Sequence, residues 1–245
     1  MPEIAGATPR VARAGYKDWG RCDLSCIALD EGTTVAGVTT QNICCSAEVD
    51  LCRANLAHGR ARALVVNAGN SNAFTGQRGK DAVDSIIAQV SGHLNCDASE
   101  IFVSSTGVIG VPLPIDKAQA GLTAVFDAAP CSWEDVTHTI GTTDTFVKGA
   151  TASAMVDGRK VQLVGIIKGS GMIAPDMATM LVYLFTDAQI TQERLQAMVS
   201  EITARTFNCI TVDSDTSTSD TLLCAATGAS GVAGDHAEFV TALEG

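Results

Sequence analysis

Short apolar runs alternate along the chain with stretches in which apolar residues recur every three to four positions. The runs are three to seven residues long and rich in Val, Ile and Leu, as is typical of buried strands. They occupy residues 63–66, 101–103, 161–167, 180–185, 210–212 and 221–226. Residues 81–94 and a second stretch beginning at Thr191 have the spacing of amphipathic helices. The pattern therefore predicts a mixed α/β protein.

Polar loops that contain glycine follow three of the predicted strands, at residues 67–76, 104–107 and 168–171. Because a sheet fixes the ends of its strands, such loops commonly carry binding groups. The asparagines of the first loop fit either a pocket lining or ordinary turn formation. No Pro/Ser-rich linker or change in composition divides the chain, so the pattern indicates one α/β unit.

Composition narrows the classes of protein. The chain has 245 residues, of which 46% are apolar and 18% charged, and this is too apolar for a disordered chain. The 16 basic and 27 acidic residues give a net charge of −11. That charge disfavours nucleic acids and anionic membranes as partners, since both require clustered Lys and Arg. No apolar stretch is long enough for a signal peptide or a membrane span, so we expect a cytoplasmic protein.

Nine cysteines and four histidines are scattered along the chain. An odd number of cysteines without a C-x-x-C pair argues against a disulfide framework and against a zinc site. Cys22 and Cys26 have a ligand-like spacing, but no second pair or His cluster follows them. We therefore expect buried thiols in a reducing compartment and no metal site.

Three common chemical motifs are absent. A phosphate-binding loop would need a Ser or Thr after Lys80, where the chain has Asp81. No serine has both glycines of the G-x-S-x-G nucleophile turn. The acidic stretch 213–220 lacks the glycine and the glutamate of a calcium-binding loop. It predicts instead a polar turn whose hydroxyls bond the local backbone.

Thr179 stands at the mouth of the predicted strand 180–185, directly after Ala178. A threonine hydroxyl is a weak nucleophile and needs a neighbouring base. One such base is the residue's own α-amino group, whose ordinary pKa of about 7.7–8.0 lies near physiological pH. This would require cleavage of the Ala178–Thr179 bond to make Thr179 an N-terminus. By spacing alone, a threonine that simply begins a strand is the commoner explanation.

Five stretches resemble, in order and spacing, the motifs of one enzyme family. They are residues 65–73, 105–110, 142–145, 168–181 and 213–221, of which 168–181 is the most specific. The family is that of the ornithine acetyltransferases, the bifunctional, self-cleaving glutamate N-acetyltransferases of arginine biosynthesis. The resemblance implies an α/β fold of layered sheets and helices, of the type found in ornithine acetyltransferases and N-terminal-nucleophile aminopeptidases.

The resemblance also implies a mechanism. The Thr179 hydroxyl attacks the Ala178 carbonyl, and hydrolysis of the resulting ester leaves residues 1–178 as an α chain and 179–245 as the start of a β chain. The freed Thr179 then takes the acetyl group from N-acetylornithine and passes it to glutamate. Its α-amine acts as general base in this ping-pong transfer.

Further residues receive roles from the resemblance. The Thr106 hydroxyl and the Gly107 N–H are expected to stabilise the tetrahedral oxyanion, a contribution commonly worth about 10²–10³ in rate. Lys168 and Thr145 are expected to bind substrate together with Thr179. The family uses no cofactor, and whether acetyl-CoA serves as a second acetyl donor is left open. The resemblance also suggests a heterotetramer of two α and two β chains.

The family's sequences continue beyond the point that matches Gly245, through a segment that supplies a substrate-binding glutamate. Residues 235–245 predict the beginning of a helix with Asp235 as its N-cap, so we expect a truncated chain. Two alternatives to an active transferase therefore stay open. One is an inactive truncated homologue, and the other is a related self-processing amidase or aminopeptidase.

Overall fold

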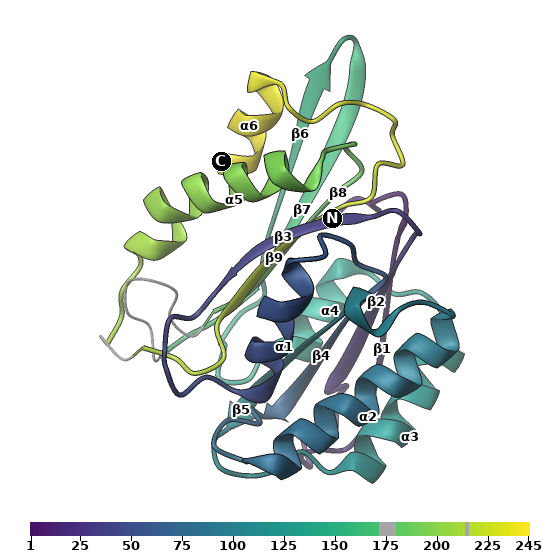
Figure 1. Ribbon diagram of the computed structural model, residues 1–245, viewed down its shortest axis with the longest axis vertical. Helices are drawn as coiled ribbons and strands as arrows, with labels where there is room; N and C mark the ends of the chain where they lie inside the picture. Colours follow the sequence, from purple (N-terminus) through teal and green to yellow (C-terminus); the bar gives the residue numbers. More distant parts are fainter. Residues whose placement is uncertain (172–179, 214–215) are drawn as a thin grey trace.

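Two β-sheets pack face to face in the centre of the protein, and helices cover their outer faces (Figure 1). The computed structural model describes residues 1–171, 180–213 and 216–245. One sheet has the strand order β1 (Ala7–Ala12), β2 (Leu24–Leu29), β4 (Ala63–Asn70) and β5 (Ile101–Val108). The other has the order β3 (Thr34–Thr39), β9 (Thr221–Ala226), β8 (Leu181–Thr186), β7 (Arg159–Lys168) and β6 (Lys148–Val156). The predicted layered α/β fold is confirmed.

The helices form the outer layers and seal the edges between the sheets. The first sheet is covered by α2 (Gln77–Leu94) and α3 (Ile115–Asp127), and the second by α5 (Gln192–Arg205) and α6 (Ala237–Glu244). Helices α1 (Ala47–Leu56) and α4 (Trp133–Ile140) contact strands of both sheets. Helices α2 and α5 each turn an apolar face inward, as their spacing predicts.

The core between the sheets is built from large side chains of facing strands. Phe102 on β5 packs with Ile166 on β7 and with Tyr183 and Phe185 on β8. Trp133 of α4 stacks on Phe185 with ring centroids 4.5 Å apart. This core couples the two sheets, so that residues at their neighbouring ends are held in a fixed relation.

Strands β4 and β5 run parallel and continue beyond their apolar runs. Asn67 pairs with Ser105 and Gly69 with Gly107, although the apolar pattern predicts strands that end at residues 66 and 103. Strand β4 is buried along its whole length because helices cover one face and the second sheet covers the other. The polar residues beyond the apolar run are therefore rigid parts of the sheet.

In the second sheet, the end of β7 lies in register with the starts of β8 and β9. Lys168, the last residue of β7, pairs with Leu181 at the start of β8, and Leu181 pairs with Thr221 at the start of β9. Strands β7 and β8 are antiparallel, whereas β8 and β9 are parallel. The chain therefore enters β8 directly beside the end of β7.

Two local predictions are wrong. Residues 210–212 form no strand. They follow a short 3₁₀ turn, and the side chains of Ile210 and Val212 are exposed. Helix α6 begins one residue later than predicted, with His236 rather than Asp235 as its N-cap. The apolar pattern also missed β1, β2, β3 and β6, whose sequences mix Ala, Thr, Ser and Gly with the larger apolar residues.

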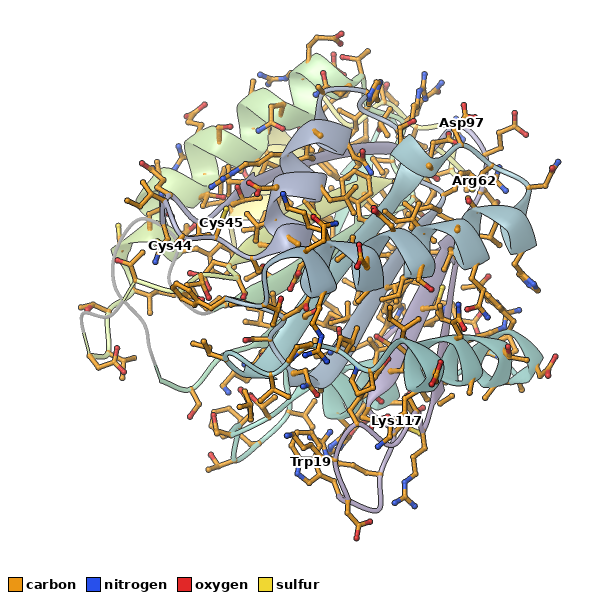
Figure 2. The ribbon with its side chains drawn as sticks, turned by 60° about the horizontal axis from the view of Figure 1, so that its bottom comes forward. Trp19, Cys44, Cys45, Arg62, Asp97 and Lys117 are labelled. Carbon is orange, nitrogen blue, oxygen red and sulfur yellow. The ribbon has the colours of Figure 1, made fainter. Side chains whose placement is uncertain are left out.

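All nine cysteines are free thiols, but only some are buried as predicted. Cys26, Cys52 and Cys224 lie in the core, whereas Cys44 and Cys209 are exposed. Cys44 and Cys45 follow one another at the surface just before α1 (Figure 2). In the described residues, no three His, Cys, Asp or Glu side chains gather as metal ligands. None of the helices there is long and apolar enough to cross a membrane.

Candidate functional site

A buried lysine and a buried threonine from different sheets meet at the centre of the site. Lys168 at the end of β7 is 4% exposed, and Thr106 on β5 is 6% exposed. The Lys168 Nζ donates to Thr106 Oγ1 at 2.9 Å. Because that oxygen accepts from the lysine, the threonine's own O–H is free to donate to a third group. The pair is thus arranged to offer a polarised hydroxyl donor.

The environment of Lys168 weakens its hold on its proton. Burial lowers the pKa of Lys168 below its ordinary value, and the nearby cation of Lys148 acts in the same direction. Asp144 and Asp220 oppose this shift by stabilising the ammonium. Two carboxyl groups therefore flank the one buried lysine that the described residues place at this site.

Asp144 fixes the loop in which Thr145 lies. Its Oδ1 accepts from the Lys148 side chain and from the Gly169 N–H, which ties the loop to the end of β7. Burial opposes ionisation of Asp144, but these hydrogen bonds and Lys168 hold its pKa below the ordinary value. Thr145 itself is exposed beside this anchored carboxylate. It lies at the border of the site rather than in its buried centre.

Gly107 follows Thr106 at the exposed end of β5, where the backbone of β4 comes very close. Gly107 has a φ of +130°, and a Cβ placed on it would lie 2.4 Å from the backbone carbon of Gly69. Gly69 has a φ of +125°. Only glycine fits both the dihedral angle and the space. The exposed backbone of Gly107 is therefore accessible beside the buried Thr106 hydroxyl.

Asp220 holds the chain at the point where it enters β8. The Met180 N–H donates to Asp220 Oδ1 at 2.8 Å, and Asp220 is 1% exposed. Its Oδ2 is buried and has no partner within strict hydrogen-bond geometry among the described residues, although the Ser217 side chain lies close enough to influence it. Burial raises the pKa of Asp220 to about 7, although Ser217, the Met180 N–H and Lys168 act to lower it. Asp220 can therefore exchange a proton near neutral pH.

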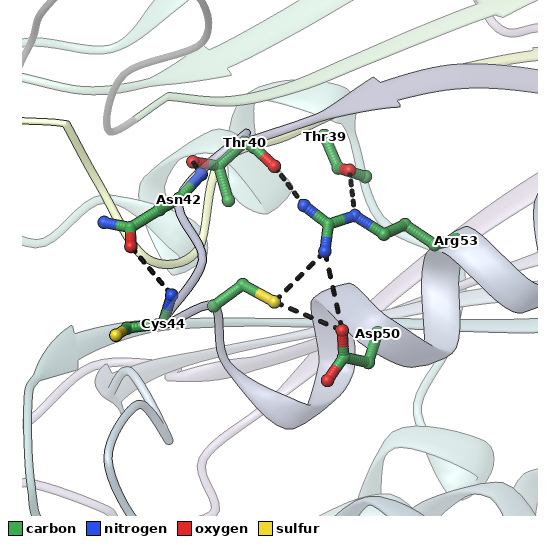
Figure 3. Close-up of polar contacts among 7 residues, drawn as sticks. Thr39, Thr40, Asn42, Cys44, Asp50 and Arg53 are labelled. Carbon is green, nitrogen blue, oxygen red and sulfur yellow. Dashed lines mark hydrogen bonds and ion pairs between the residues drawn. The ribbon is translucent and has the colours of Figure 1, made fainter.

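The segment that carries Asp220 is anchored by the end of β3. Thr40 donates its N–H to the Asp220 carbonyl at 2.9 Å and its hydroxyl to the Ser217 carbonyl at 2.7 Å. Arg53 of α1 holds this strand end in turn, through the Thr39 hydroxyl and the Thr40 carbonyl (Figure 3). As predicted, hydroxyls in the stretch 213–220 bond the local backbone, while its residues 214 and 215 lie outside the described residues.

A second buried carboxyl lies on α1, against the loop that follows β4. Glu48 of α1 accepts from Asn72 Nδ2 at 3.2 Å, and its Oε1 has no partner within hydrogen-bond geometry among the described residues. Burial raises the pKa of Glu48 to about 7. Asn72 has a φ of +55°, which favours a turn-forming role for it, and Asn67 accepts from the Ser105 hydroxyl at 2.6 Å. Sequence reasoning missed Asp220 as a member of the site and gave Glu48 no role.

Four of the six predicted site residues are described by the structure, and two are not. Thr106, Gly107 and Lys168 lie together, and Thr145 occupies the loop that Asp144 ties to Gly169. Thr179 and Ala178 lie outside the described residues. Met180, the residue that follows Thr179 in the sequence, is held against Asp220 beside these groups. The roles assigned to all six residues stay predictions.

Relatives resemble the chain over almost its whole length. The ArgJ family model matches residues 9–245. An arginine biosynthesis bifunctional protein ArgJ from Zymomonas mobilis is 57% identical over 94% of this chain and 56% of its own length. A protein of the same name from Ruegeria pomeroyi is 50% identical over 100% of this chain and 61% of its own length. The chain thus spans little more than half the length of the curated relatives it matches.

Solved structures resemble the fold described above. A crystal structure of arginine biosynthesis bifunctional protein ArgJ from Bacillus halodurans has 30% identity and a TM-score of 0.63, over 71% of this chain and 92% of that chain. An ornithine acetyltransferase complexed with ornithine, from Mycobacterium tuberculosis, has 30% identity and a TM-score of 0.59 over 70% and 92%. An l-aminopeptidase d-Ala-esterase/amidase from Ochrobactrum anthropi, at 11% identity and a TM-score of 0.55 over 91% and 72%, shares the fold alone.

Proposed function

Because this chain belongs to the ArgJ family of arginine biosynthesis, we propose that it is part of an enzyme that transfers the acetyl group of N-acetylornithine to glutamate. The observation that carries the proposal is the buried contact between Lys168 Nζ and Thr106 Oγ1, which leaves the threonine hydroxyl free to donate. Such a donor is what an acyl-transfer site needs where charge develops on oxygen. Thr179, outside the described residues, is the proposed nucleophile.

The first step is self-cleavage. The Thr179 Oγ attacks the Ala178 carbonyl carbon, the C–N bond between the two residues breaks, and the hydroxyl proton passes to the departing nitrogen. Water then hydrolyses the ester, which leaves a carboxylate on Ala178 and a free α-amine on Thr179. Residues 1–178 form the first chain, and a second chain begins at Thr179.

The coverage of the solved structures supports this division. Each of the two structures at 30% identity matches about 170 of the 245 residues here, yet is covered over 92% of its own chain. A precursor that separates near residue 178 would give an amino-terminal chain of about this size. We further propose that two copies of each cleaved chain assemble into a heterotetramer of two α and two β chains.

In the transfer itself, Thr179 Oγ attacks the acetyl carbonyl of N-acetylornithine. The α-amine of Thr179 takes the hydroxyl proton and delivers it to the departing amine of ornithine, which leaves an acetyl ester on Thr179. The amine of glutamate then attacks this ester, and the threonine hydroxyl is regenerated. Thr106 O–H and Gly107 N–H stabilise the negative oxygen in both halves of the reaction.

Lys168 has two functions in this scheme. It orients the Thr106 hydroxyl through the 2.9 Å hydrogen bond, and its remaining N–H groups are available to a substrate carboxylate. Thr145, exposed at the border of the site, would contact the same substrate. No cofactor takes part, and acetyl-CoA as a second donor would enter through the same acetyl-threonine. We propose that the enzyme acts in the cytoplasm.

Intact mass and product analysis test the proposal. Purified protein should separate into two chains that meet at the Ala178–Thr179 bond, whereas the Thr179→Ala variant should stay whole. Incubation with N-acetylornithine and glutamate, in a version extended to the length of the relatives, should yield N-acetylglutamate. Release of free acetate instead would favour the self-processing amidase. A folded protein with neither cleavage nor turnover would identify an inactive homologue.

A further inference from the structure

Asp220 is positioned to act on the peptide bond that follows the nucleophile. Its Oδ1 accepts the Met180 N–H at 2.8 Å, and Met180 is joined by that same nitrogen to Thr179. Met180 is the first described residue after the proposed nucleophile, so the group that holds its amide acts next to that nucleophile in the sequence. The resemblance gives Asp220 no role, and its geometry alone singles it out.

We propose that Asp220 is a positioning residue, whose ionised carboxylate holds the Met180 amide and thereby raises the rate of self-cleavage at the preceding residue. This inference rests on the proposed self-cleaving function. Three observations support it: the carboxyl group is 1% exposed, it sits where β7, β8 and β9 begin or end in register, and its own backbone is pinned by Thr40. A carboxylate at a strand end buried this deeply is costly unless it has a specific partner.

Ionisation decides how firmly the amide is held. A hydrogen bond from an N–H to a carboxylate is roughly twice as strong as one to a neutral oxygen. Burial raises the pKa of Asp220 to about 7, so the stronger hydrogen bond to the carboxylate is lost as the pH falls below neutrality. Lys168 is the charged group that favours the carboxylate, and it is itself influenced by Asp144 and Lys148. Glu48 of α1 is the other described carboxyl whose pKa lies at about 7.

Self-cleavage reports the ionisation of Asp220 separately from that of the Thr179 α-amine, the proposed general base of acetyl transfer. In the precursor, the nitrogen of Thr179 is part of a peptide bond and does not titrate. The two described carboxyl groups with a raised pKa are therefore the expected source of a pH dependence near neutrality. Asp220→Asn keeps an oxygen that can accept the Met180 N–H but removes the charge, and Glu48→Gln does the same for the second carboxyl.

The first experiment follows cleavage of chains made by cell-free synthesis and released into buffers of pH 5.5 to 8.5. The wild-type rate should rise through a midpoint near 7. Asp220→Asn should flatten this rise and slow cleavage about tenfold at pH 8, with a change within about twofold at pH 5.5. Glu48→Gln and the exposed-site control Asp116→Asn should keep the midpoint. A wild-type midpoint that persists in Asp220→Asn would overturn the proposal.

The second experiment observes the contact without requiring cleavage. The uncleaved Thr179→Ala chain is labelled with ¹⁵N-methionine, and the Met180 amide is assigned by loss of its signal in Met180→Leu. The Met180 proton shift should titrate with a midpoint near 7, and Asp220→Asn should abolish the titration. An unchanged midpoint, or none at all, would refute the role of Asp220. Absence of cleavage in wild type together with a normal Met180 titration would instead refute the proposed function.

Discussion

Replacing Gly107 with alanine should destabilise the fold and displace the edge of the site. Gly107 has a φ of +130°, where a side chain costs about 1–3 kcal/mol. The new Cβ would also lie 2.4 Å from the backbone carbon of Gly69, whereas ordinary contacts begin at 3.4 Å. The two strands must therefore separate by about 1 Å, and overpacking of this kind costs about 1–3 kcal/mol more. The expected loss of about 2–6 kcal/mol is large against a typical stability of about 5–15 kcal/mol.

Urea unfolding of the uncleaved Thr179→Ala background measures this loss on a single chain. Two other glycines supply matched controls. Gly110 has a φ of +79° but nothing within 4 Å of its Cβ position, so Gly110→Ala reports backbone strain without overlap. Gly92 in α2 is open and helical, and Gly92→Ala should stabilise by about 0.4–1 kcal/mol. If Gly107→Ala unfolds no more easily than Gly110→Ala, the close approach of the strands is not as tight as described.

Three further predictions concern buried charges. Lys168→Met should lower acetyl transfer by about 10²–10³, because Thr106 loses the group that orients its hydroxyl. It should also lower Tm, because Asp144 and Asp220 lose a buried counter-charge, and a folded variant with wild-type transfer would contradict the role of Lys168. The pKa of Glu48 is about 7 in the folded protein and about 4.3 in an unfolded chain. Between these two pH values, only the folded state keeps Glu48 protonated. The free energy of unfolding therefore falls as the pH rises from about 4.3 to about 7. Glu48→Gln should therefore be more stable than wild type in urea at pH 8 and about equal at pH 4.5, and the reverse order would contradict the sign. Asp23→Ala should cost about 2–4 kcal/mol in urea unfolding, since its carboxylate accepts three consecutive N–H groups of residues 14–16; a loss below about 1 kcal/mol would show that water replaces them.

Part of the fold follows directly from the apolar pattern. Strands β7, β8 and β9 and helices α2 and α5 lie where apolar spacing predicts them, because each buries a continuous or one-sided set of large side chains. Strand β6 was missed because it is an edge strand with a mostly exposed surface and small side chains. In such a strand, pairing with a neighbour replaces apolar spacing as the determinant of structure.

The site was predictable in its residues but not in its contacts. Thr106 and Lys168 were singled out through motif resemblance, yet they are 62 residues apart and belong to different sheets. No local pattern reports their 2.9 Å contact, because it depends on how the sheets pack through residues such as Phe102 and Tyr183. The sequence predicts a polar turn at Asp220, because a buried carboxyl and a solvated one cannot be told apart from the residue type.

The order of strands in the second sheet has a consequence for any chain cut at Thr179. Strands β8 and β9 follow the cut, but they lie between β3 and β7, which precede it. The two fragments would therefore be interleaved, with hydrogen-bond ladders on both sides that must break together for them to part. Refolding from separated fragments would be bimolecular and concentration-dependent, whereas the uncut chain folds as one molecule. The cut should thus convert a reversibly folding protein into one whose persistence depends on never unfolding.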